Sequence, residues 1–218
     1  MNVEQARFNM IEQQIRPSGI LNQEVLDLFY LVKRENFVPA SARALAFAEM
    51  QIPLPGGQCL LTPQFEARLL QELSLRPGER VLEIGSGSGH LTALLATAVQ
   101  DGQVTSLEID PVLADLAREN LAKNGISNAR VETADGLSGW PAGAPYDAIV
   151  LSGSLDAIPS VLLEQLAPGG RLLAVVGSEP AQQLQRWQRH SDGSCSPHTL
   201  GETRIPALRA TASKAFTF

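Results

Sequence analysis

Cysteine is scarce in this chain of 218 residues: two are present, Cys59 and Cys195, far apart and with no C-x-x-C pair. That pattern argues against a disulfide framework and favours free thiols in a reducing compartment. Long apolar runs are missing as well, because no window approaches the ~18 uninterrupted apolar residues of a membrane-spanning helix. The first residues have neither the basic region nor the apolar run of a signal peptide. We therefore expect a soluble, cytoplasmic protein that does not bind a membrane.

Basic residues are also few. The chain has 17 Lys and Arg against 23 Asp and Glu, a net charge of −6, and no run of basic residues. Nucleic-acid binding requires clustered Lys and Arg to neutralise phosphates, so we expect no nucleic-acid partner. Hydrophobic residues make up 44% and charged residues 18%, which excludes a disordered chain. The length suits one domain with its own core, and no sequence signal indicates an oligomeric state.

Motifs of several enzyme classes are absent. There is no G-x-S-x-G nucleophile elbow, no G-K-[ST] phosphate loop and no H-E-x-x-H zinc motif. The histidines, His90, His190 and His198, are scattered, and no His/Cys cluster has metal-ligand spacing, so no metal is predicted. His90 is expected in the first turn of a helix beside a ligand, with an imidazole base as the alternative. These absences argue against an enzyme with a G-x-S-x-G nucleophile elbow, a P-loop enzyme and an H-E-x-x-H zinc protease.

Residues 1–75 read as a helical extension with a lid. Apolar residues at helical spacing predict helices over Gln5–Ile15 and Asn22–Arg34. The prolines and glycines of residues 38–63 cannot sit inside one helix, so this segment is expected to be an ordered loop with short elements. Its part Ile52–Pro63 is the expected lid. Pro63 suits the first turn of another helix.

Residues 76–218 alternate between strands and helices. The strands are predicted over Arg80–Ile84, Val104–Ile109, Ala129–Thr133, Tyr146–Leu151 and Arg171–Val176. Such alternation predicts a parallel sheet covered on both faces. After it we expect a helix over Gln182–Arg189 and strands near Glu202–Leu208 and Ala210–Phe218. The fold class is therefore α/β: a doubly wound, mostly parallel, Rossmann-like sheet with an N-terminal helical extension, in a single domain of residues 1–218.

A glycine loop follows the first of these strands. Its glycines, Gly85, Gly87 and Gly89, are spaced G-x-G-x-G, and Glu83 lies two residues before the first. Glycine lets the backbone turn sharply and approach a ligand, and the next helix offers free N–H groups. A dinucleotide fingerprint would place its third glycine at position 90, where His90 stands. The loop resembles motif I of class I S-adenosylmethionine (SAM)-dependent methyltransferases, with a structural tight turn as the alternative.

Two acidic residues at later strand ends sharpen the choice of ligand. Glu108 ends the second strand, where a carboxylate can accept hydrogen bonds from both ribose hydroxyls. Asp135 ends the third strand, where such methyltransferases contact adenine. An NAD site would also tolerate Glu108, but Asp135 and the residue at position 90 favour SAM. The predicted cofactor residues are Glu83, Gly85, Ser86, Gly87 and Gly89 around the methionine, Glu108 and Ile109 at the ribose, and Asp135, Gly136 and Leu137 at the adenine.

Other parts of the chain resemble the protein-L-isoaspartate (D-aspartate) O-methyltransferase family. The matching pieces are Met10–Ile15 (M-I-E-Q-Q-I), Arg34–Pro39, Ile52–Gln58, Val81–Gly89, Asp135–Pro141 (D-G-L-S-G-W-P), Tyr146–Ile149, Leu166–Leu172 and Arg204–Leu208. They cover nearly the whole chain. The resemblance implies a protein-repair enzyme that uses SAM to methylate the abnormal carboxylate of isoaspartyl residues in damaged proteins. Isoaspartyl-containing proteins or peptides would be its partners.

The departures from the family pattern lie where the acceptor is expected. The family usually has T-I-S-Q-P after Gly57-Gln58, so Leu61 stands in place of a serine that is tied to activity, and Thr62 is a possible substitute. We expect Leu61, Thr62 and Ser152 to face the acceptor. A carboxylate acceptor needs no general base, and no catalytic residue is assigned. Because leucine forms no hydrogen bond, activity on isoaspartyl peptides is expected to be weak, unless Leu61 packs into the core.

The alternatives are a methyltransferase for another acceptor and a SAM-binding protein without turnover. Both would keep the cofactor residues and lose the isoaspartyl chemistry at Leu61.

Overall fold

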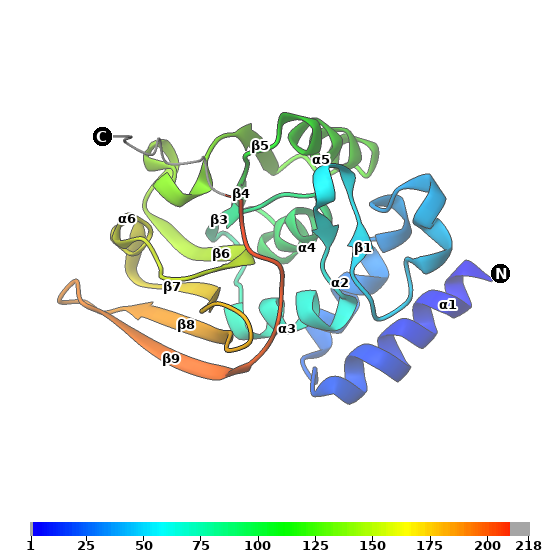
Figure 1. The fold of residues 1–218 in the computed structure, drawn as a ribbon, viewed down its shortest axis with the longest axis horizontal. Coiled ribbons are helices and arrows are strands. Elements are labelled where there is room, and N and C mark those ends of the chain that lie inside the picture. Colours follow the sequence, from blue (N-terminus) through cyan, green and yellow to red (C-terminus); the bar gives the residue numbers. More distant parts are fainter. Residues whose placement is uncertain (1, 210–218) are drawn as a thin grey trace.

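A seven-stranded sheet forms the centre of the computed structural model, which describes residues 2–209 (Figure 1). The strand order is β5-β4-β3-β6-β7-β8-β9. The first five strands of that order run parallel, and β8 and β9 join antiparallel at one edge. Their bounds are β3 (Arg80–Ile84), β4 (Gln103–Glu108), β5 (Ala129–Thr133), β6 (Tyr146–Leu155), β7 (Leu166–Val176), β8 (Gln183–Arg189) and β9 (Cys195–Glu202). The mostly parallel sheet is confirmed.

Helices cover both faces of the sheet. Alternate residues of the strands point to opposite faces, so that Val81 joins the cluster under α4 (His90–Val99) and α5 (Pro111–Lys123), whereas Leu82 joins the cluster with α6 (Ser160–Glu164). The crossovers from β3 to β5 therefore lie on one face, and the crossover from β6 to β7 lies on the other. This is the doubly wound arrangement that the sequence predicts.

The N-terminal extension packs over the α4 side. It consists of α1 (Val3–Met10), prolonged by a π-helical turn Ile11–Ile15 and a 3₁₀ turn Arg16–Ser18, then α2 (Gln23–Leu31) and α3 (Pro63–Leu73). Between α2 and α3 lie 3₁₀ turns and a two-stranded sheet of β1 (Ile52–Pro53) and β2 (Cys59–Leu60). These elements confirm the predicted helices and the ordered loop between them.

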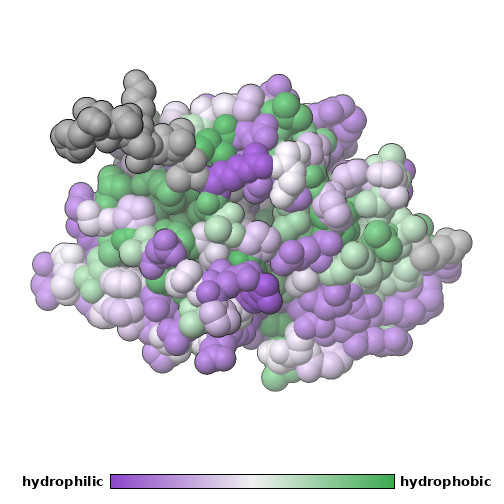
Figure 2. All heavy atoms as spheres, viewed as in Figure 1, coloured by the Kyte–Doolittle hydropathy of each residue, from purple (hydrophilic) through white to green (hydrophobic). Residues whose placement is uncertain are grey.

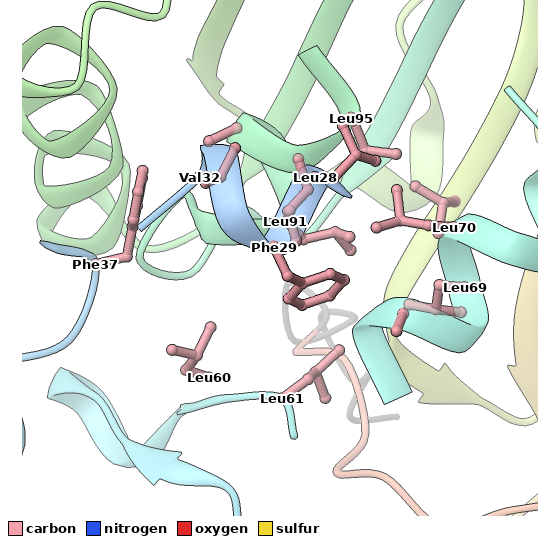
Figure 3. Close-up of a cluster of buried hydrophobic side chains, with 14 of the residues drawn as sticks. Leu28, Phe29, Val32, Phe37, Leu60, Leu61, Leu69, Leu70, Leu91 and Leu95 are labelled. Atoms are coloured by element: carbon pink, nitrogen blue, oxygen red, sulfur yellow. The ribbon is translucent and has the colours of Figure 1, made fainter. Parts of the chain in front are cut away.

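A buried apolar cluster holds the extension onto the sheet. Figure 3 shows Phe29 of α2, Leu69 of α3 and Leu91 of α4 in this cluster, together with Leu60 and Leu61 from the end of β2. Each fully buried side chain of this size contributes about 1.5–3 kcal/mol. Figure 2 shows hydrophilic residues gathered over α1, whose outer face is exposed. Among residues 2–209, no helix is both long and apolar enough to cross a membrane.

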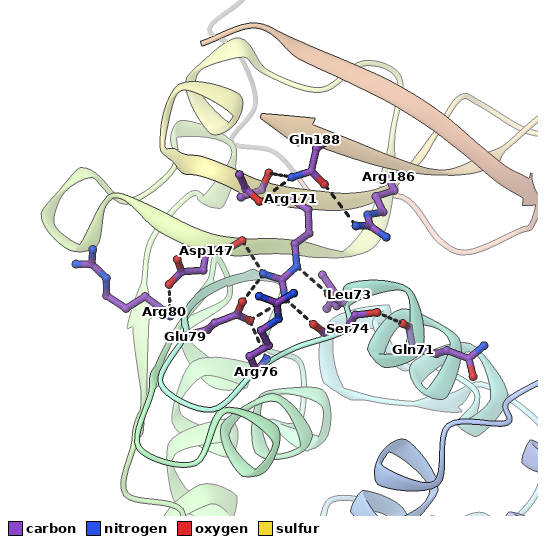
Figure 4. A network of polar contacts seen from close by, with 12 residues as sticks. Gln71, Leu73, Ser74, Arg76, Glu79, Arg80, Asp147, Arg171, Arg186 and Gln188 are labelled. Carbon is purple, nitrogen blue, oxygen red and sulfur yellow. Dashed lines mark hydrogen bonds and ion pairs between the residues drawn. The ribbon is translucent and has the colours of Figure 1, made fainter. Parts of the chain in front are cut away.

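Arg171 of β7 ties the end of α3 to the sheet (Figure 4). Its guanidinium donates to both carboxylate oxygens of Glu79 at 2.7 Å. It also donates to the carbonyls of Leu73 (2.7 Å), Ser74 (3.1 Å) and Asp147 (3.0 Å). All five bonds are made by a side chain that is 9% exposed. Arg171 therefore joins the turn after α3 to the strands β6 and β7.

The C-terminal part differs from the sequence prediction. The helix predicted over Gln182–Arg189 is wrong: residues 183–189 form β8, which pairs antiparallel with β7. Its Gln and Arg residues are good helix formers, but pairing with an open sheet edge overrides that preference. Strand β9 ends at Glu202, so the strand predicted near Glu202–Leu208 is also misplaced. That segment makes one bridge, Ala207 to Ser154. The strand predicted over Ala210–Phe218 lies outside the described residues.

Candidate functional site

A cavity lies at the carboxyl ends of the parallel strands. The chain builds β3, β4 and β5 toward one edge and then returns to add β6 on the other side of β3. Such a reversal leaves a crevice outside the strand ends, where α/β proteins bind ligands. The predicted site residues that line it are Leu61, Gly85, Ser86, Gly87, Glu108, Ile109, Gly136, Leu137 and Ser152.

The glycine loop depends on conformations that glycine adopts easily. Gly85 has φ +97°, and a Cβ at this position would lie 2.6 Å from the hydroxyl oxygen of Ser152. The Ser152 hydroxyl lies within hydrogen-bond distance of the carbonyls of Ile84 (2.9 Å) and Gly85. Ser152 therefore holds the loop in place. It also lines the cavity, and its predicted contact with the acceptor stays a prediction.

Glu108 connects the second strand end to the glycine loop. Its Oε2 accepts from the Gly87 N–H at 2.9 Å, and its Oε1 accepts from the Asp110 N–H at 3.1 Å. The residue is 6% exposed and lines the cavity. Each carboxylate oxygen has about two lone-pair sites, so each keeps one for a further donor. Two adjacent acceptors of this kind suit the two hydroxyls of a ribose.

The third strand end forms a tight turn. Asp135 accepts from the Leu137 N–H at 3.0 Å and so caps the 3₁₀ turn Gly136–Ser138. A Cβ on Gly136 would lie 2.4 Å from the Ile84 side chain, so the turn can approach the strand only with glycine there. Gly136 and Leu137 line the cavity, but Asp135 is not among its lining residues. Its carboxylate therefore shapes the turn, and its contact with adenine stays a prediction.

Glu83 and Gly89 lie beneath the loop and do not line the cavity. Glu83 is fully buried, and its Oε2 accepts from the hydroxyls of Thr92 (2.5 Å) and Ser106 (2.7 Å). Because side chains alternate along a strand, Glu83 points toward α4 rather than toward the strand end. Gly89 is the N-cap of α4, immediately before its first residue, and lies against Ala117 of α5. These two residues support the loop, and their contact with a ligand stays a prediction.

Burial raises the pKa of Glu83 from 4.5 to about 8, although the Ser106 and Thr92 hydroxyls oppose the shift. Because Glu83 binds its proton more tightly in the folded state than in the unfolded state, the protonated carboxyl group contributes stability. This contribution is fully present below pH 4.5 and is lost as the pH rises through 8. The variant Glu83→Gln cannot ionise and keeps an oxygen for Thr92 and Ser106. We therefore expect its free energy of unfolding to rise relative to the wild type between pH 5 and 8, as measured by urea denaturation.

The partly exposed Glu132 on β5 provides the control for that experiment. Glu132→Gln should follow the wild-type pH profile. A Glu83→Gln stability difference that stays constant from pH 5 to 8 would contradict the raised pKa.

A buried polar cluster that no sequence pattern predicts lies beside the cavity. Arg34 forms an ion pair with Glu66 Oε2, and His90 Nδ1 lies 2.9 Å from the same oxygen. Arg34 also donates to the carbonyls of Leu61 (2.5 Å) and Ala46 (3.0 Å). Burial lowers the pKa of His90, which keeps its imidazole neutral at pH 7 and lets Nδ1–H donate to Glu66. The cluster fixes the backbone of Leu61, and fully buried His90 is not among the residues that line the cavity.

Leu61 separates the cavity from a second one. Its side chain is 5% exposed, packs with Phe29 and Leu69 (Figure 3), and forms part of the wall of both cavities. Thr62 lines only the second, where its hydroxyl caps α3 by accepting from the Phe65 N–H at 3.3 Å. The Thr62 hydroxyl therefore does not occupy the position that a serine side chain at 61 would take.

The segment after β9 closes one side of the cavity. Figure 1 shows it, in red, running from β9 back toward β4, and residues 206–209 line the cavity. The guanidinium of Arg209 lies 3.6 Å from the carboxylate of Asp110 and donates to the carbonyl of Gly56 in the predicted lid. Only the likeness of residues 204–208 to a known family's last strand could have drawn attention to this segment.

Comparison with known proteins gives concordant matches. The sequence model of the family protein-L-isoaspartate(D-aspartate) O-methyltransferase matches residues 5–210. A protein-L-isoaspartate O-methyltransferase of Methylorubrum populi is 40% identical over 205 residues, which are 94% of this chain and 95% of that protein. One of Methanoculleus marisnigri is 42% identical over 178 residues, 82% of this chain and 80% of that protein.

Solved structures match the fold over nearly the whole chain. A protein-L-isoaspartate O-methyltransferase has a TM-score of 0.83 at 24% identity, covering 94% of this chain and 66% of that one. A putative enzyme of this kind from Plasmodium falciparum, in complex with S-adenosyl-L-homocysteine, has a TM-score of 0.82 at 21% identity, covering 96% and 99%. These two likenesses confirm the predicted fold class.

Proposed function

Because the chain belongs to the protein-L-isoaspartate (D-aspartate) O-methyltransferase family, we propose that it uses SAM to methylate the carboxylate of isoaspartyl residues in damaged proteins. The observation that carries this proposal is the adjacency of the two cavities, which share Leu61 as a wall. One cavity has the loop and the carboxylate that suit the cofactor. The other offers room for an acceptor next to it.

The residues of the first cavity fit SAM, which supplies an electrophilic methyl group when bound. We assign the ribose hydroxyls to Glu108, next to Ile109, because both Glu108 oxygens keep a free lone pair. The adenine is assigned to Gly136 and Leu137 at the end of β5, and the methionine to the glycine loop with Ser86. The glycine loop is supported by Glu83 and Gly89, and the turn after β5 is capped by Asp135.

The second cavity suits a peptide that carries a carboxylate. Arg68 and Arg204 lie in its wall, together with the acid Glu49. Arg204 is paired with Glu179 at 2.6 Å, whereas Arg68 uses one nitrogen to donate to the Leu200 carbonyl at 2.8 Å. A carboxylate is already a nucleophile and needs no proton removed. The contribution of the chain is therefore to align the acceptor oxygen and to exclude water, which can supply several kcal/mol of barrier reduction.

The two alternatives are not favoured. Three relatives that are 40%, 42% and 38% identical over most of the chain are named protein-L-isoaspartate O-methyltransferases, which supports turnover and an isoaspartyl acceptor. We further propose a cytoplasmic location without a nucleic-acid partner. The free thiols of Cys59 and Cys195 and the net charge of −6 support it.

A methyl-transfer assay with tritiated SAM and an isoaspartyl peptide tests the proposed function. Methyl esters hydrolyse in mild base, whereas methyl groups on nitrogen do not. Label that is released as methanol in base is the expected product. Label that resists base would show another kind of acceptor, and no label at all would contradict the proposal.

The variant Leu61→Ser is expected to methylate the isoaspartyl peptide about 10- to 100-fold faster than the wild type. A hydroxyl at the wall between the cavities can donate to a carboxylate, and such a bond contributes roughly 1.5–3 kcal/mol. Initial rates of base-labile methyl transfer measure the effect. Loss of the buried leucine will also lower stability, by about 2–5 kcal/mol.

Leu60→Ser is the matched control, because Leu60 is equally buried but lines only the first cavity. It should lose stability without gaining rate. If the wild type is already fast and Leu61→Ser leaves the rate unchanged, the missing hydroxyl has no influence on the reaction.

A further inference from the structure

Among residues 2–209, two of the buried side-chain polar atoms that lack hydrogen-bond partners belong to residues that line the cavity assigned to the cofactor. They are Oε1 of Glu66 and the hydroxyl oxygen of Ser88. Both residues are 1% exposed, and both line the cavity assigned to the cofactor. Buried polar atoms without partners are rare in folded proteins and require an explanation. Their position in a ligand cavity indicates that a ligand supplies the partners.

The state of Glu66 restricts what that ligand carries. Its Oε2 is already occupied by Arg34 and His90, and Oε1 remains. A carboxylate oxygen only accepts hydrogen bonds, so its missing partner is a donor, and a cationic donor gives the stronger bond. The Ser88 hydroxyl can donate to a negatively charged group. Together they present an acceptor and a donor to the same ligand.

The order of the strands tells which end of the cofactor lies here. Leu137 follows β5, Glu108 ends β4, and the glycine loop follows β3. These strands are neighbours in the order β5-β4-β3, so adenine at β5 and ribose at β4 direct the rest of the molecule toward β3. Ser88 belongs to the loop after β3, and Glu66 binds His90 in the first turn of the next helix.

We propose that Glu66 and Ser88 bind the amino-acid head of SAM, with Glu66 Oε1 accepting from the ammonium and the Ser88 hydroxyl donating to the carboxylate. This assignment rests on the proposed function and deepens it. Arg34 and His90 are then positioning residues, because they hold Oε2 of Glu66 and leave Oε1 for the ligand.

Calorimetric titration with three ligands tests the proposal without measuring turnover. The ligands are S-adenosylhomocysteine, its analogue without the α-amino group, and 5′-methylthioadenosine, which lacks the whole head. The wild type should bind the deamino analogue about 10- to 100-fold more weakly than S-adenosylhomocysteine, as expected for a lost charge-assisted bond. Glu66→Gln should bind S-adenosylhomocysteine more weakly than the wild type does, by a similar factor. It should bind the deamino analogue about as well as it binds S-adenosylhomocysteine.

Glu35→Gln serves as the control, and Ser88→Ala tests the second proposed contact. Glu35→Gln changes another buried glutamate that pairs with an arginine, Arg7, but lies outside the cavity, so it should bind all three ligands as the wild type does. Ser88→Ala should weaken binding of S-adenosylhomocysteine and leave 5′-methylthioadenosine unaffected. If Glu66→Gln does not fold, the double variant Arg34→Gln/Glu66→Gln removes the unpaired buried charge and takes its place.

The outcomes separate this proposal from the proposed function. If Glu66→Gln weakens all three ligands equally, or none of them, Glu66 has only a structural role and the proposal is wrong. The same conclusion follows if the wild type binds the deamino analogue as tightly as S-adenosylhomocysteine. If the wild type binds none of the three at millimolar concentration, the proposed function itself fails.

Discussion

Replacing Glu108 by alanine is expected to weaken binding of S-adenosylhomocysteine by about 5- to 150-fold, or about 1–3 kcal/mol. The variant removes the two acceptors assigned to the ribose hydroxyls. It also removes the partners of the Gly87 and Asp110 N–H groups, so the glycine loop loses its tie to β4. Calorimetric titration of the folded variant measures the loss directly.

Glu132→Ala is the matched control for Glu108→Ala. Glu132 lies on the neighbouring strand β5, is partly exposed, and faces Arg130 at 4.0 Å. It should bind S-adenosylhomocysteine as the wild type does. If Glu108→Ala and the wild type bind S-adenosylhomocysteine with equal affinity, Glu108 does not bind the ribose.

Replacing Arg171 by methionine is expected to lower the free energy of unfolding by about 3–5 kcal/mol, because the change leaves a partly buried carboxylate without its partner. Although burial opposes it, hydrogen bonds from Arg171 help to hold the pKa of Glu79 below its ordinary value. Three carbonyls, at Leu73, Ser74 and Asp147, lose a donor at the same time. Urea denaturation measures the effect.

Arg186→Met is the control on the adjacent strand, because within residues 2–209 the Arg186 side chain makes a single hydrogen bond, to Gln188 at 3.4 Å (Figure 4). It should change stability by less than ~1 kcal/mol. The double variant Arg171→Met/Glu79→Leu should recover part of the loss, since no unpaired charge remains. An Arg171→Met variant as stable as Arg186→Met would contradict the central role of Arg171.

The sequence predicts the parts of the fold that have a local signal. Strands of the parallel sheet are buried on both faces and appear as short apolar runs, such as Arg80–Ile84, whose bounds the structure reproduces. The tail has no such signal. Residues 183–189 have the composition of a helix, and only the free edge of β7 makes them a strand.

The candidate site divides in the same way. Glycine spacing and acids at strand ends point to Gly85, Gly87 and Glu108, because the carboxyl ends of parallel strands meet at one edge. The cluster of Arg34, Glu66 and His90 has no such signal, since its members are 32 and 24 residues apart and are joined only by packing of the extension. The glycine motif contains both side chains that line the cavity and side chains that support the loop beneath it, such as Glu83. The sequence alone therefore does not distinguish the two kinds of residue.

Methyl transfer to an isoaspartyl peptide and to its aspartyl twin tests the central claim most directly. The two peptides have the same composition and charge, and they differ only in which carboxyl group of the residue continues the backbone. We expect base-labile label from tritiated SAM on the isoaspartyl peptide and none above background on the twin. Equal labelling of both peptides, or no labelling of either by a protein that binds S-adenosylhomocysteine, would contradict the account.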